Sequence, residues 1–377
     1  MKKFTFTLIL LTISLITNAQ VNIPDSNFEG ALVTFGMDTD GVVNGQISTA
    51  DALAITNLSV GSQNVTDLTG INSFTNLTYF ACDNNTNLQS FYFNIPNLET
   101  LNVINANITT IDLSGLPNLK VLYIDNNSNM SALDITTNAL LETVYARNCN
   151  LSSVQPNTNY PYLDIRLSNN NITGDIDLTL LVNAVTLDFS NNMLNSIDVT
   201  GLTDLSFLAV DNCNLSDLDV TTNINLTNLT AIGNDFICLD LSQNPLLDGV
   251  EVGNNAYANM TIAVSDVTAA NAATGIYQWW YKDATATYGT TCGTATVSEN
   301  GLVSTINIYP NPVIDTLNII STQNATYTMY DINGRAILNG IINIGNNTLE
   351  LSYFDSGIYF LKVMSQDKYL TKRIILK

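Results

Sequence analysis

Among the side chains suited to acid–base or metal chemistry, carboxylates are the abundant ones in this sequence. The 377 residues include 33 Asp and Glu, 12 Lys and Arg and no His, which gives a formal net charge of −21. Without histidine, the chain cannot build a Ser-His-Asp triad, a His-ligated zinc site or an imidazole acid–base pair. The excess of acid also argues against a nucleic-acid partner, because neutralising phosphates requires clustered Lys and Arg.

Several aspartates recur at one position of a repeated segment. They are Asp112, Asp134, Asp177, Asp198, Asp219 and Asp240. Two carboxylates about 5–10 Å apart can hydrolyse a glycosidic bond, so a polysaccharide-degrading enzyme is one alternative. However, no insertion that would form a pocket interrupts the repeats. A column this regular indicates architecture, and we expect no enzyme.

Residues 38–51, with the sequence DTDGVVNGQISTAD, form a second group of oxygen-bearing side chains. The candidate metal ligands are Asp38, Asp40, Asn44 and Asp51. The segment resembles the calcium loop of EF-hand or dockerin type, in which hard oxygen ligands and a turn glycine surround the ion. It departs from that pattern by two extra residues and by Asp in place of the final Glu. The broken spacing favours a polar turn without metal, so we expect either no cofactor or a calcium ion here.

An internal repeat determines which elements position these residues. Its first apolar residue, the anchor, recurs every 21 or 22 residues, at Leu58, Phe80, Leu101, Leu122, Val144, Ile165, Leu187, Leu208, Leu229 and Val250. Since strand side chains alternate, the anchor and the residue two positions later point inward on a short strand. Five residues after most anchors comes an Asn or Cys, at Asn85, Asn127, Cys149, Asn170, Asn192, Cys213, Asn234 and Asn255. We expect these side chains to satisfy backbone groups where the chain turns inward.

Over about residues 55–260, this pattern closely resembles leucine-rich repeat proteins. The resemblance implies a parallel solenoid with a strand-lined concave face. Repeats of 21–22 residues are too short for a long helix on the convex side, so we expect a second short strand or extended turn there. The predicted fold is mainly β: about ten coils over residues 58–260, followed by a small antiparallel β-sandwich.

The strand pattern brings a group of aromatic and charged residues together on the concave face. Tyr123, Tyr145 and Arg166 follow three successive anchors and should lie side by side at about 4.8 Å spacing. The full set of candidate binding residues is Tyr79, Tyr123, Asp125, Tyr145, Arg147, Arg166 and Phe207. Tyr and Arg are favoured at binding hot spots, and stacked Tyr rings also suit sugars. The alternative is packing of the Tyr rings with an Arg–Asp pair for stability alone.

The ends of the body have different compositions. Residues 1–19 begin with Lys2 and Lys3, continue with an apolar stretch and end at the small residue Ala19, after which cleavage is expected. This pattern predicts a signal peptide. No later segment has about 18 uninterrupted apolar residues, so we expect no transmembrane segment in the mature chain. Residues 20–57 and 261–297 are expected to cap the solenoid, with a helix over 25–36. A disulfide between Cys238 and Cys292 is expected to close the second cap, while the other three cysteines face inward.

Residues 298–377 carry six acids and six bases, whereas residues 20–297 have a net charge of −23. Alternating apolar runs separated by turn residues predict a small antiparallel β-sandwich. Its motif residues are Pro310, Asn311, Pro312, Asn333, Gly334, Arg335, Gly357 and Tyr359. These motifs resemble the C-terminal sorting domain of type IX secretion substrates of Bacteroidetes-type bacteria. The resemblance implies recognition by the type IX machinery, export across the outer membrane, and often tail removal with surface attachment.

Together these observations predict a secreted or cell-surface leucine-rich repeat protein that binds an unidentified protein or glycan, in recognition or adhesion. Its mechanism would be complementarity over an extended surface. The alternatives are the polysaccharide-degrading enzyme and a purely structural surface component.

Overall fold

The computed structural model describes residues 19–88, 92–155, 163–176, 178, 181–256, 259–292, 306–332, 335–365 and 368–377. Of the predicted leader, only Ala19 lies within this set, and Asn333, Gly334 and Asp177 lie outside it. The chain divides into two compact units, Met1–Cys292 and Gly293–Lys377. In the described residues, no helix is long and apolar enough to cross a membrane.

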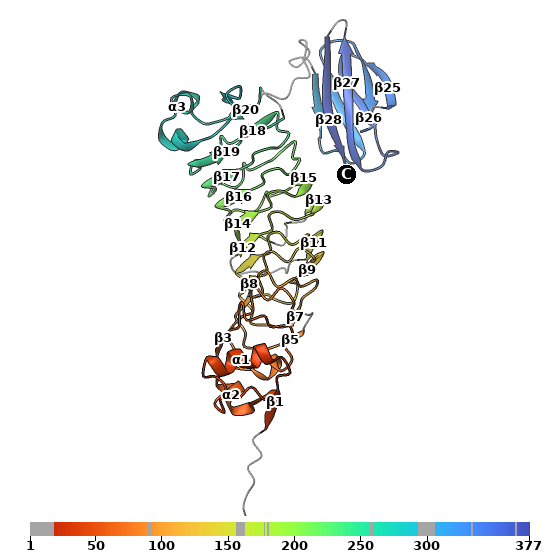
Figure 1. The fold of residues 1–377 in the computed structure, drawn as a ribbon. Helices are drawn as coiled ribbons and strands as arrows, with labels where there is room; N and C mark the ends of the chain where they lie inside the picture. Colours follow the sequence, from red (N-terminus) through yellow and green to blue (C-terminus); the bar gives the residue numbers. More distant parts are fainter. Residues whose placement is uncertain are drawn as a thin grey trace, which may run out of the picture. The chain divides into compact units, whose positions relative to one another are not determined.

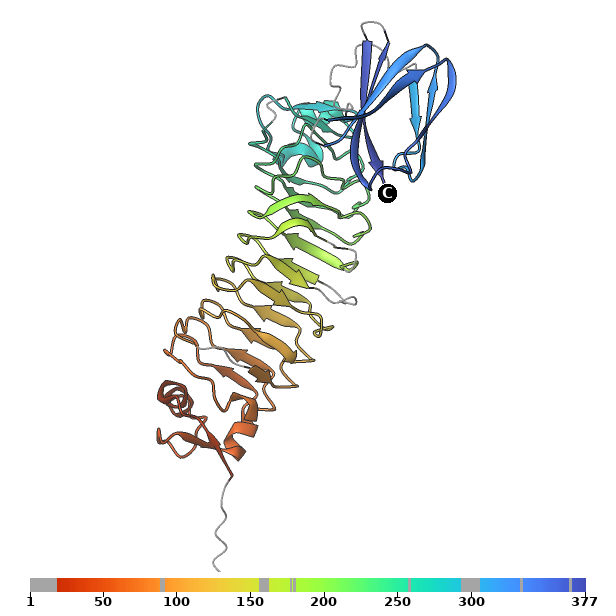
Figure 2. The same cartoon turned by 90° about the vertical axis from the view of Figure 1, so that its right-hand side faces the viewer.

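The first unit is built on a parallel sheet of ten strands, one from each coil (Figures 1 and 2). In sheet order, the strands are β3 (Asn57–Ser59), β4 (Tyr79–Ala81), β6 (Thr100–Asn102), β8 (Val121–Tyr123), β10 (Thr143–Tyr145), β12 (Leu163–Arg166), β14 (Ala184–Asp188), β16 (Phe207–Ala209), β17 (Asn228–Thr230) and β19 (Gly249–Glu251). Every predicted anchor lies opposite the next one, from Leu58 with Phe80 to Leu229 with Val250. The predicted solenoid and its register are therefore confirmed. We name the outer side of this sheet the ten-stranded face.

The opposite side of several coils carries a second set of short strands, as predicted for repeats of this length (Figure 1). They pair as β5 (Tyr92–Asn94) with β7 (Asp112–Gly115), β9 (Ala132–Asp134) with β11 (Ser153–Gln155), β13 (Thr173–Ile176) with β15 (Met193–Ile197), and β18 (Cys238–Asp240) with β20 (Thr261–Ala263) and β21 (Thr287–Gly289). All these pairs are parallel.

The repeated aspartates lie on this opposite side of the coils and close turns there. Asp134 Oδ1 accepts hydrogen bonds from Thr136 N at 2.9 Å and Thr136 Oγ1 at 2.7 Å. These bonds hold the pKa of the Asp134 carboxyl below its usual value. The same contact to the N–H two residues later occurs at Asp112, Asp198, Asp219 and Asp240. This use of the side chain is typical of Asx turns, so the column has a structural role at each of these positions.

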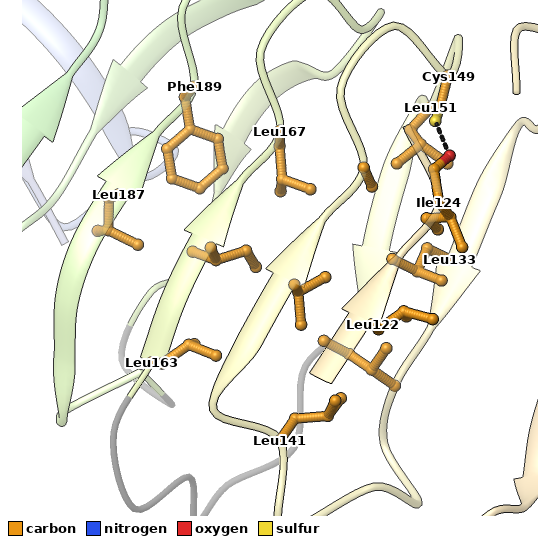
Figure 3. Packing of buried hydrophobic residues seen from close by; sticks show 14 of the residues in the cluster. Leu122, Ile124, Leu133, Leu141, Cys149, Leu151, Leu163, Leu167, Leu187 and Phe189 are labelled. Carbon is orange, nitrogen blue, oxygen red and sulfur yellow. Dashed lines mark hydrogen bonds between the residues drawn. The ribbon is translucent and has the colours of Figure 1, made fainter. Parts of the chain in front are cut away.

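Side chains of one type stack from coil to coil to form a continuous core. Figure 3 shows Leu122 on β8, Leu163 on β12 and Leu187 on β14, with Ile124, Leu167 and Phe189 further along the same coils. Leu122, Ile124 and Leu187 are fully buried. Because every coil covers the apolar side of the next, only the two ends of the stack need separate caps.

The asparagine five residues after the anchor bridges two coils. Asn127 donates from Nδ2 to Val103 O at 2.8 Å and to Ile124 O at 2.7 Å. Its Oδ1 accepts from Ala106 N at 3.1 Å and Ile108 N at 3.2 Å. Equivalent bonds join Asn85, Asn170, Asn192, Asn234 and Asn255 to their own and the preceding coil. We name this set, with Cys149 and Cys213, the asparagine ladder.

The two cysteines of the ladder keep part of this bonding. Cys149 Sγ donates to Ile124 O at 3.1 Å (Figure 3), and Cys213 Sγ donates to Phe189 O at 3.2 Å. Both thiols are buried, and burial raises the pKa of each to about 11. As predicted, Cys82, Cys149 and Cys213 are free and face the core.

The residue just before the ladder position has a positive φ in all ten coils. These residues are Ser62, Asn84, Asn105, Asn126, Asn148, Asn169, Asn191, Asn212, Gly233 and Asn254. Left-handed backbone is costly for most L-residues, but Asn and Gly tolerate it well. This requirement explains why the coil corner repeats Asn as well as the ladder position.

The N-terminal cap contains β1 (Gln20–Asn22) paired antiparallel with β2 (Gln46–Ser48), and helices α1 (Ser26–Thr34) and α2 (Thr49–Ala54). Asp25 caps α1, and its Oδ2 also accepts Thr66 N at 2.7 Å, which ties the helix to the first coil. Burial alone would raise the pKa of Asp25, but hydrogen bonds from Thr66 and Phe28 outweigh it and lower the pKa. The short helix η1 (Ile71–Ser73) follows in that coil.

The C-terminal cap contains α3 (Val267–Asn271) and the short helix η2 (Gly275–Trp279). Trp280 Nε1 donates to Leu247 O at 3.2 Å, and its ring packs edge-on against Tyr277 at 4.8 Å. Cys238 and Cys292, the pair expected from the sequence, form a disulfide that links β18 to the residues just after β21.

The second unit is an antiparallel β-sandwich, as predicted. One sheet has the order β22 (Ile306–Tyr309), β23 (Thr316–Ser321), β26 (Gly345–Glu350), and the other has the order β25 (Ala336–Ile342), β24 (Ala325–Tyr330), β27 (Gly357–Ser365), β28 (Lys368–Leu376). Leu317 and Leu349 from the first sheet share one core with Met329 and Leu361 from the second.

We expect Asn127→Ala to lower the free energy of unfolding of the first unit by about 3 kcal/mol or more, because it leaves buried backbone donors and acceptors unpaired at about 1–3 kcal/mol each. Asn127→Cys should cost less, since Cys149 retains one of these bonds at the same position. Denaturant unfolding measures both. Asn129→Ala is the control, because the exposed Asn129 bonds only the side chain of Asn107. An equal loss for Asn127→Ala and Asn129→Ala would contradict the bridging role.

Candidate binding surface

Three adjacent strands of the ten-stranded face bring two tyrosines and an arginine into one row. The register places Tyr123 of β8 opposite Tyr145 of β10, and Tyr145 opposite Arg166 of β12. The centroids of the two tyrosine rings lie 5.2 Å apart, with the ring planes at 51°. This separation is typical of a favourable aromatic pair.

Two arginines enclose the ring of Tyr145. The guanidinium carbon of Arg147 lies 5.2 Å from the ring centroid and that of Arg166 lies 4.8 Å away. Both distances fall within the range of cation–π attraction. We name Tyr123, Tyr145, Arg147 and Arg166 the Tyr–Arg patch.

Each arginine of the patch is held by an aspartate. Arg147 Nη2 lies 2.6 Å from Asp125 Oδ2, and Asp125 Oδ1 also accepts Arg147 N at 2.7 Å. Arg166 Nε lies 3.0 Å from Asp164 Oδ1, and Tyr145 Oη donates to Asp164 Oδ2 at 2.9 Å. The aspartates therefore fix the rotamers of both arginines and of the central tyrosine.

The pKa directions within the patch have clear causes. Burial raises the pKa of the Tyr145 phenol, and its hydrogen bond to the Asp164 carboxylate raises it further. Hydrogen bonding to Asp125 raises the pKa of Arg147, and bonding to Asp164 does the same for Arg166. Both guanidiniums thus stay charged and the phenol stays protonated at neutral pH.

The arginines of the patch are accessible from solvent. The side chains of Arg147 and Arg166 are 39% and 37% exposed. A guanidinium has five N–H donors, and each of these uses its Nε and one Nη in its ion pair. The remaining donors and the ring edges form a preorganised surface for a flat, polar ligand group.

Tyr79 and Phe207, also expected at this surface, lie in a different row. Tyr79 of β4 is two strands from Tyr123, and Phe207 of β16 is two strands beyond Arg166. In the register of the sheet both lie one residue before their anchors, whereas Tyr123 and Tyr145 lie one residue after theirs. The structure brings Tyr123, Asp125, Tyr145, Arg147 and Arg166 together, with Tyr79 and Phe207 flanking them about 10 Å away.

Sequence reasoning missed Asp164 and an acidic row further along the same face. Asp188 of β14, Asp211 after β16 and Glu251 of β19 make up this row. Burial raises the pKa of Asp211, and the charges of Asp188 and Glu251 raise it further. The signal was available, because Asp164, Asp188 and Glu251 lie next to their anchors and Asp211 lies three residues after Leu208, all at outward positions of the repeat. The ten-stranded face therefore changes from aromatic and basic to acidic along the stack.

The four candidate metal ligands of the N-terminal cap belong to one connected loop. Asp40 Oδ2 accepts Asn44 Nδ2 at 2.8 Å, and Asp51 Oδ2 accepts Thr39 Oγ1 at 2.9 Å. Asp38 is buried next to them. Across the part of the chain that the structure describes, no three His, Cys, Asp or Glu side chains gather closely enough to hold a metal.

In the second unit, the described motif residues meet at one end of the sandwich. Asn311, which lies between Pro310 and Pro312, donates from Nδ2 to Arg373 O at 2.8 Å and accepts Ile375 N at 2.8 Å. Arg335 pairs with Asp331 at 3.0 Å in the turn between β24 and β25. Gly357 begins β27 opposite Leu376, and Tyr359 Oη donates to Asp355 O at 2.7 Å.

Three exposed apolar side chains share this end with the motif residues. Ile314, Ile332 and Tyr353 lie in its turns, and they are 68%, 71% and 90% exposed. Val313 N donates to Ile375 O at 2.8 Å, and Leu351 N donates to Asp315 O, so the turns are held beside the last strand.

Comparison with known proteins identifies the tail. Residues 307–377 match the family described as "Secretion system C-terminal sorting domain". The chain therefore carries a sorting tail that directs secretion and attachment at the cell surface. No curated protein sequence is similar enough to the chain to count as a relative.

Solved structures similar to the chain include three internalin-type proteins of Listeria monocytogenes. The functional domain of InlJ, whose title mentions a cysteine ladder, is 17% identical with a TM-score of 0.42, and the match covers 97% of this chain and 100% of that one. Internalin C2 is 20% identical with a TM-score of 0.35, covering 72% and 98%. The secreted internalin-like protein Lmo2445 is 14% identical with a TM-score of 0.30, covering 95% and 99%. These sequence identities and TM-scores are too low for a ligand of this chain to be inferred from those proteins.

Asp125→Ala should lower the free energy of unfolding by about 1–3 kcal/mol, because it removes the acceptor of Arg147 N and the partner of its guanidinium. Asp125→Asn should cost less, since an amide oxygen still accepts the N–H. Chemical denaturation compares these variants with Asp204→Ala, which removes an exposed aspartate from a turn. Equal effects of Asp125→Ala and Asp204→Ala would show that the pair does not stabilise the sheet.

Proposed function

We propose that this chain is a non-enzymatic recognition protein of the cell exterior, whose ten-stranded face binds a protein or a glycan. The observation that carries the proposal is the Tyr–Arg patch, in which two tyrosines in ring contact and two arginines are fixed by Asp125 and Asp164 at the middle of a regular sheet. Such fixed aromatic and Arg groups lose little conformational entropy when a partner binds.

The charge distribution supports a role in recognition. Residues 20–297 include 27 acidic residues and four basic ones, Lys120, Arg147, Arg166 and Lys282. Two of the four bases belong to the patch. A partner that meets the whole face would complement both this basic group and the acidic row of Asp188, Asp211 and Glu251.

The enzyme alternative has less support. The regular aspartates Asp112, Asp134, Asp198, Asp219 and Asp240 are engaged in turns, and a carboxylate that accepts local backbone hydrogen bonds is poorly placed as a general acid. Asp125 and Asp164 are held in ion pairs with Arg147 and Arg166, so neither carboxylate is free to face a substrate. A purely structural surface component remains the rival that predicts no ligand at all.

We also propose that the type IX machinery contacts the end of the tail where the motif residues meet. Ile314, Ile332 and Tyr353 supply an exposed apolar surface there, next to the exposed Arg335. Exposed apolar side chains that cluster around polar ones are typical of protein contact sites. The partner surface would be apolar with acidic groups.

Tyr123→Ala combined with Tyr145→Ala should abolish binding to glycan and protein arrays, because the two rings form the centre of the patch. The chain without leader and tail serves as the probe, since the two compact units have separate cores. Tyr92→Ala, on the opposite side of the solenoid, is the matched control. Unchanged array binding by the double variant, with its melting temperature preserved, would refute the proposed surface.

For the tail, Ile332→Asp combined with Tyr353→Asp should reduce surface display of the full chain and leave folded protein in the periplasm. Ile344→Asp is the control, because Ile344 is 66% exposed but lies between β25 and β26 at the opposite end of the sandwich. Cell fractionation in a bacterium with type IX secretion provides the measurement. Equal export of both variants would rule out this end as the contact.

A further inference from the structure

The N-terminal cap has a helix–loop–helix arrangement whose parts match a calcium-binding loop more closely than its sequence spacing suggests. Helix α1 ends at Thr34, the loop runs to the short strand β2, and Ser48 caps α2. Asp51 lies in the first turn of α2, where its N–H donates to Ser48 Oγ at 3.0 Å. A final carboxylate in the first turn of the second helix, three residues after the cap, is the arrangement that closes such a loop around its ion.

Asp38 supplies the strongest indication of a missing ligand. Its side chain is buried, with 3% of the residue exposed. One carboxylate oxygen accepts a hydrogen bond from the Asp40 backbone, whereas Oδ2 is inaccessible and has no hydrogen-bond partner among the described residues. A buried carboxylate oxygen without a partner is costly and calls for an explanation, such as an ion.

No basic side chain is available to compensate Asp38. Residues 4–119 contain neither Lys nor Arg, and the chain has no His. Instead, burial raises the pKa of Asp38, and the nearby charges of Asp40, Glu29 and Asp51 raise it further. The cap between residues 20 and 57 holds five carboxylates and no positive side chain, so a cation must come from solution.

Hydrogen bonds hold the loop in a fixed shape around this group. The buried Glu29 accepts the N–H groups of Asn44, Gly45 and Gln46 at 2.8, 2.8 and 2.9 Å. Gly41 and Gly45 have φ of 72° and 87°, a conformation that glycine adopts without strain. The two residues inserted between them, Val42 and Val43, are exposed. The insertion thus bulges toward solvent. Asp40 and Asn44, the candidate ligands on either side of it, remain joined by their side-chain hydrogen bond.

We propose that this loop binds one calcium ion, with Oδ2 of Asp38 as the buried ligand and Asp40, Asn44 and Asp51 as the other side-chain ligands. The described carboxylates do not gather around one point, so calcium binding has to draw them together. Calcium fits better than magnesium, because it accepts six to eight oxygens in irregular geometry, whereas magnesium demands a near-ideal octahedron. This site is independent of the ligand bound by the ten-stranded face.

The site would strengthen the exposed end of the solenoid. Phe28 of α1 and Ile47 of β2 are fully buried in the core that the cap shares with the first coil, and the Phe28 ring lies 6.2 Å from that of Phe74. An ion that joins the loop to α2 would hold both elements against this core. Secretion places the loop outside the cell, where calcium modules bind with dissociation constants of about 0.1–1 mM.

Calorimetric titration of the chain without its leader with calcium chloride, at constant ionic strength, tests the proposal. We expect one site per chain with a dissociation constant of about 1 mM or lower, and a rise of about 3 °C or more in the melting temperature of the first unit when calcium replaces chelator. Hydrogen–deuterium exchange should slow in residues 37–52 and not in the later coils.

Asp38→Asn distinguishes a bound ion from general screening of the acidic chain. It should lose the calorimetric signal, and in chelator its melting temperature should equal or exceed that of the wild type, because a buried unpaired charge is gone. Asp198→Asn removes the same charge from an exposed turn and should keep the full calcium response. No heat and no shift in the wild type, or an equal shift in Asp38→Asn, would overturn the proposal.

Discussion

The solenoid depends on how the inward turn of each coil satisfies its backbone. At that corner, N–H and C=O groups of two successive coils point into the core, where water cannot reach them. One asparagine side chain bonds both kinds of group. Asn127 donates to the carbonyls of Val103 and Ile124, and it accepts the N–H groups of Ala106 and Ile108. Because each Asn bonds its own coil and the one before, it fixes the stacking distance and the register together.

The candidate binding surface follows from that register. Once the anchors are aligned, the residues beside them form straight rows across the ten-stranded face. Tyr123, Tyr145 and Arg166 are neighbours in space because they hold the same position in three successive coils, although they are 22 and 21 residues apart in sequence. A one-residue slip would turn these side chains into the core and the anchors outward. The asparagine ladder and the Tyr–Arg patch are thus parts of one arrangement.

Sequence reasoning succeeded where a repeated position determines the outcome. The anchors, the ladder positions and the inward cysteines could be read from spacing alone, because each coil confirms the others. Sequence reasoning failed where the role of a side chain depends on which of several possible partners it contacts. Asp164 was missed because its role depends on reaching both Arg166, two residues later, and the hydroxyl of Tyr145 on the neighbouring strand β10.

A second set of buried asparagines was missed for a related reason. Asn138, Asn223 and Asn244 donate to carbonyls of the preceding coil on the other side of the core. They occur in only some of the coils, so no periodic signal marks them. The free oxygen of Asp38 likewise depends on burial in three dimensions, which spacing alone does not show.

Photo-crosslinking at the cell surface tests most directly whether the ten-stranded face is the recognition surface. Tyr79 lies on the ten-stranded face and is 37% exposed, whereas Tyr92 lies on the opposite side and is 50% exposed. A photoreactive phenylalanine analogue can therefore replace either residue with little loss of stability. We expect one defined partner to be captured from position 79 and none from position 92. Equal capture from both positions, or capture from position 92 alone, would contradict this expectation.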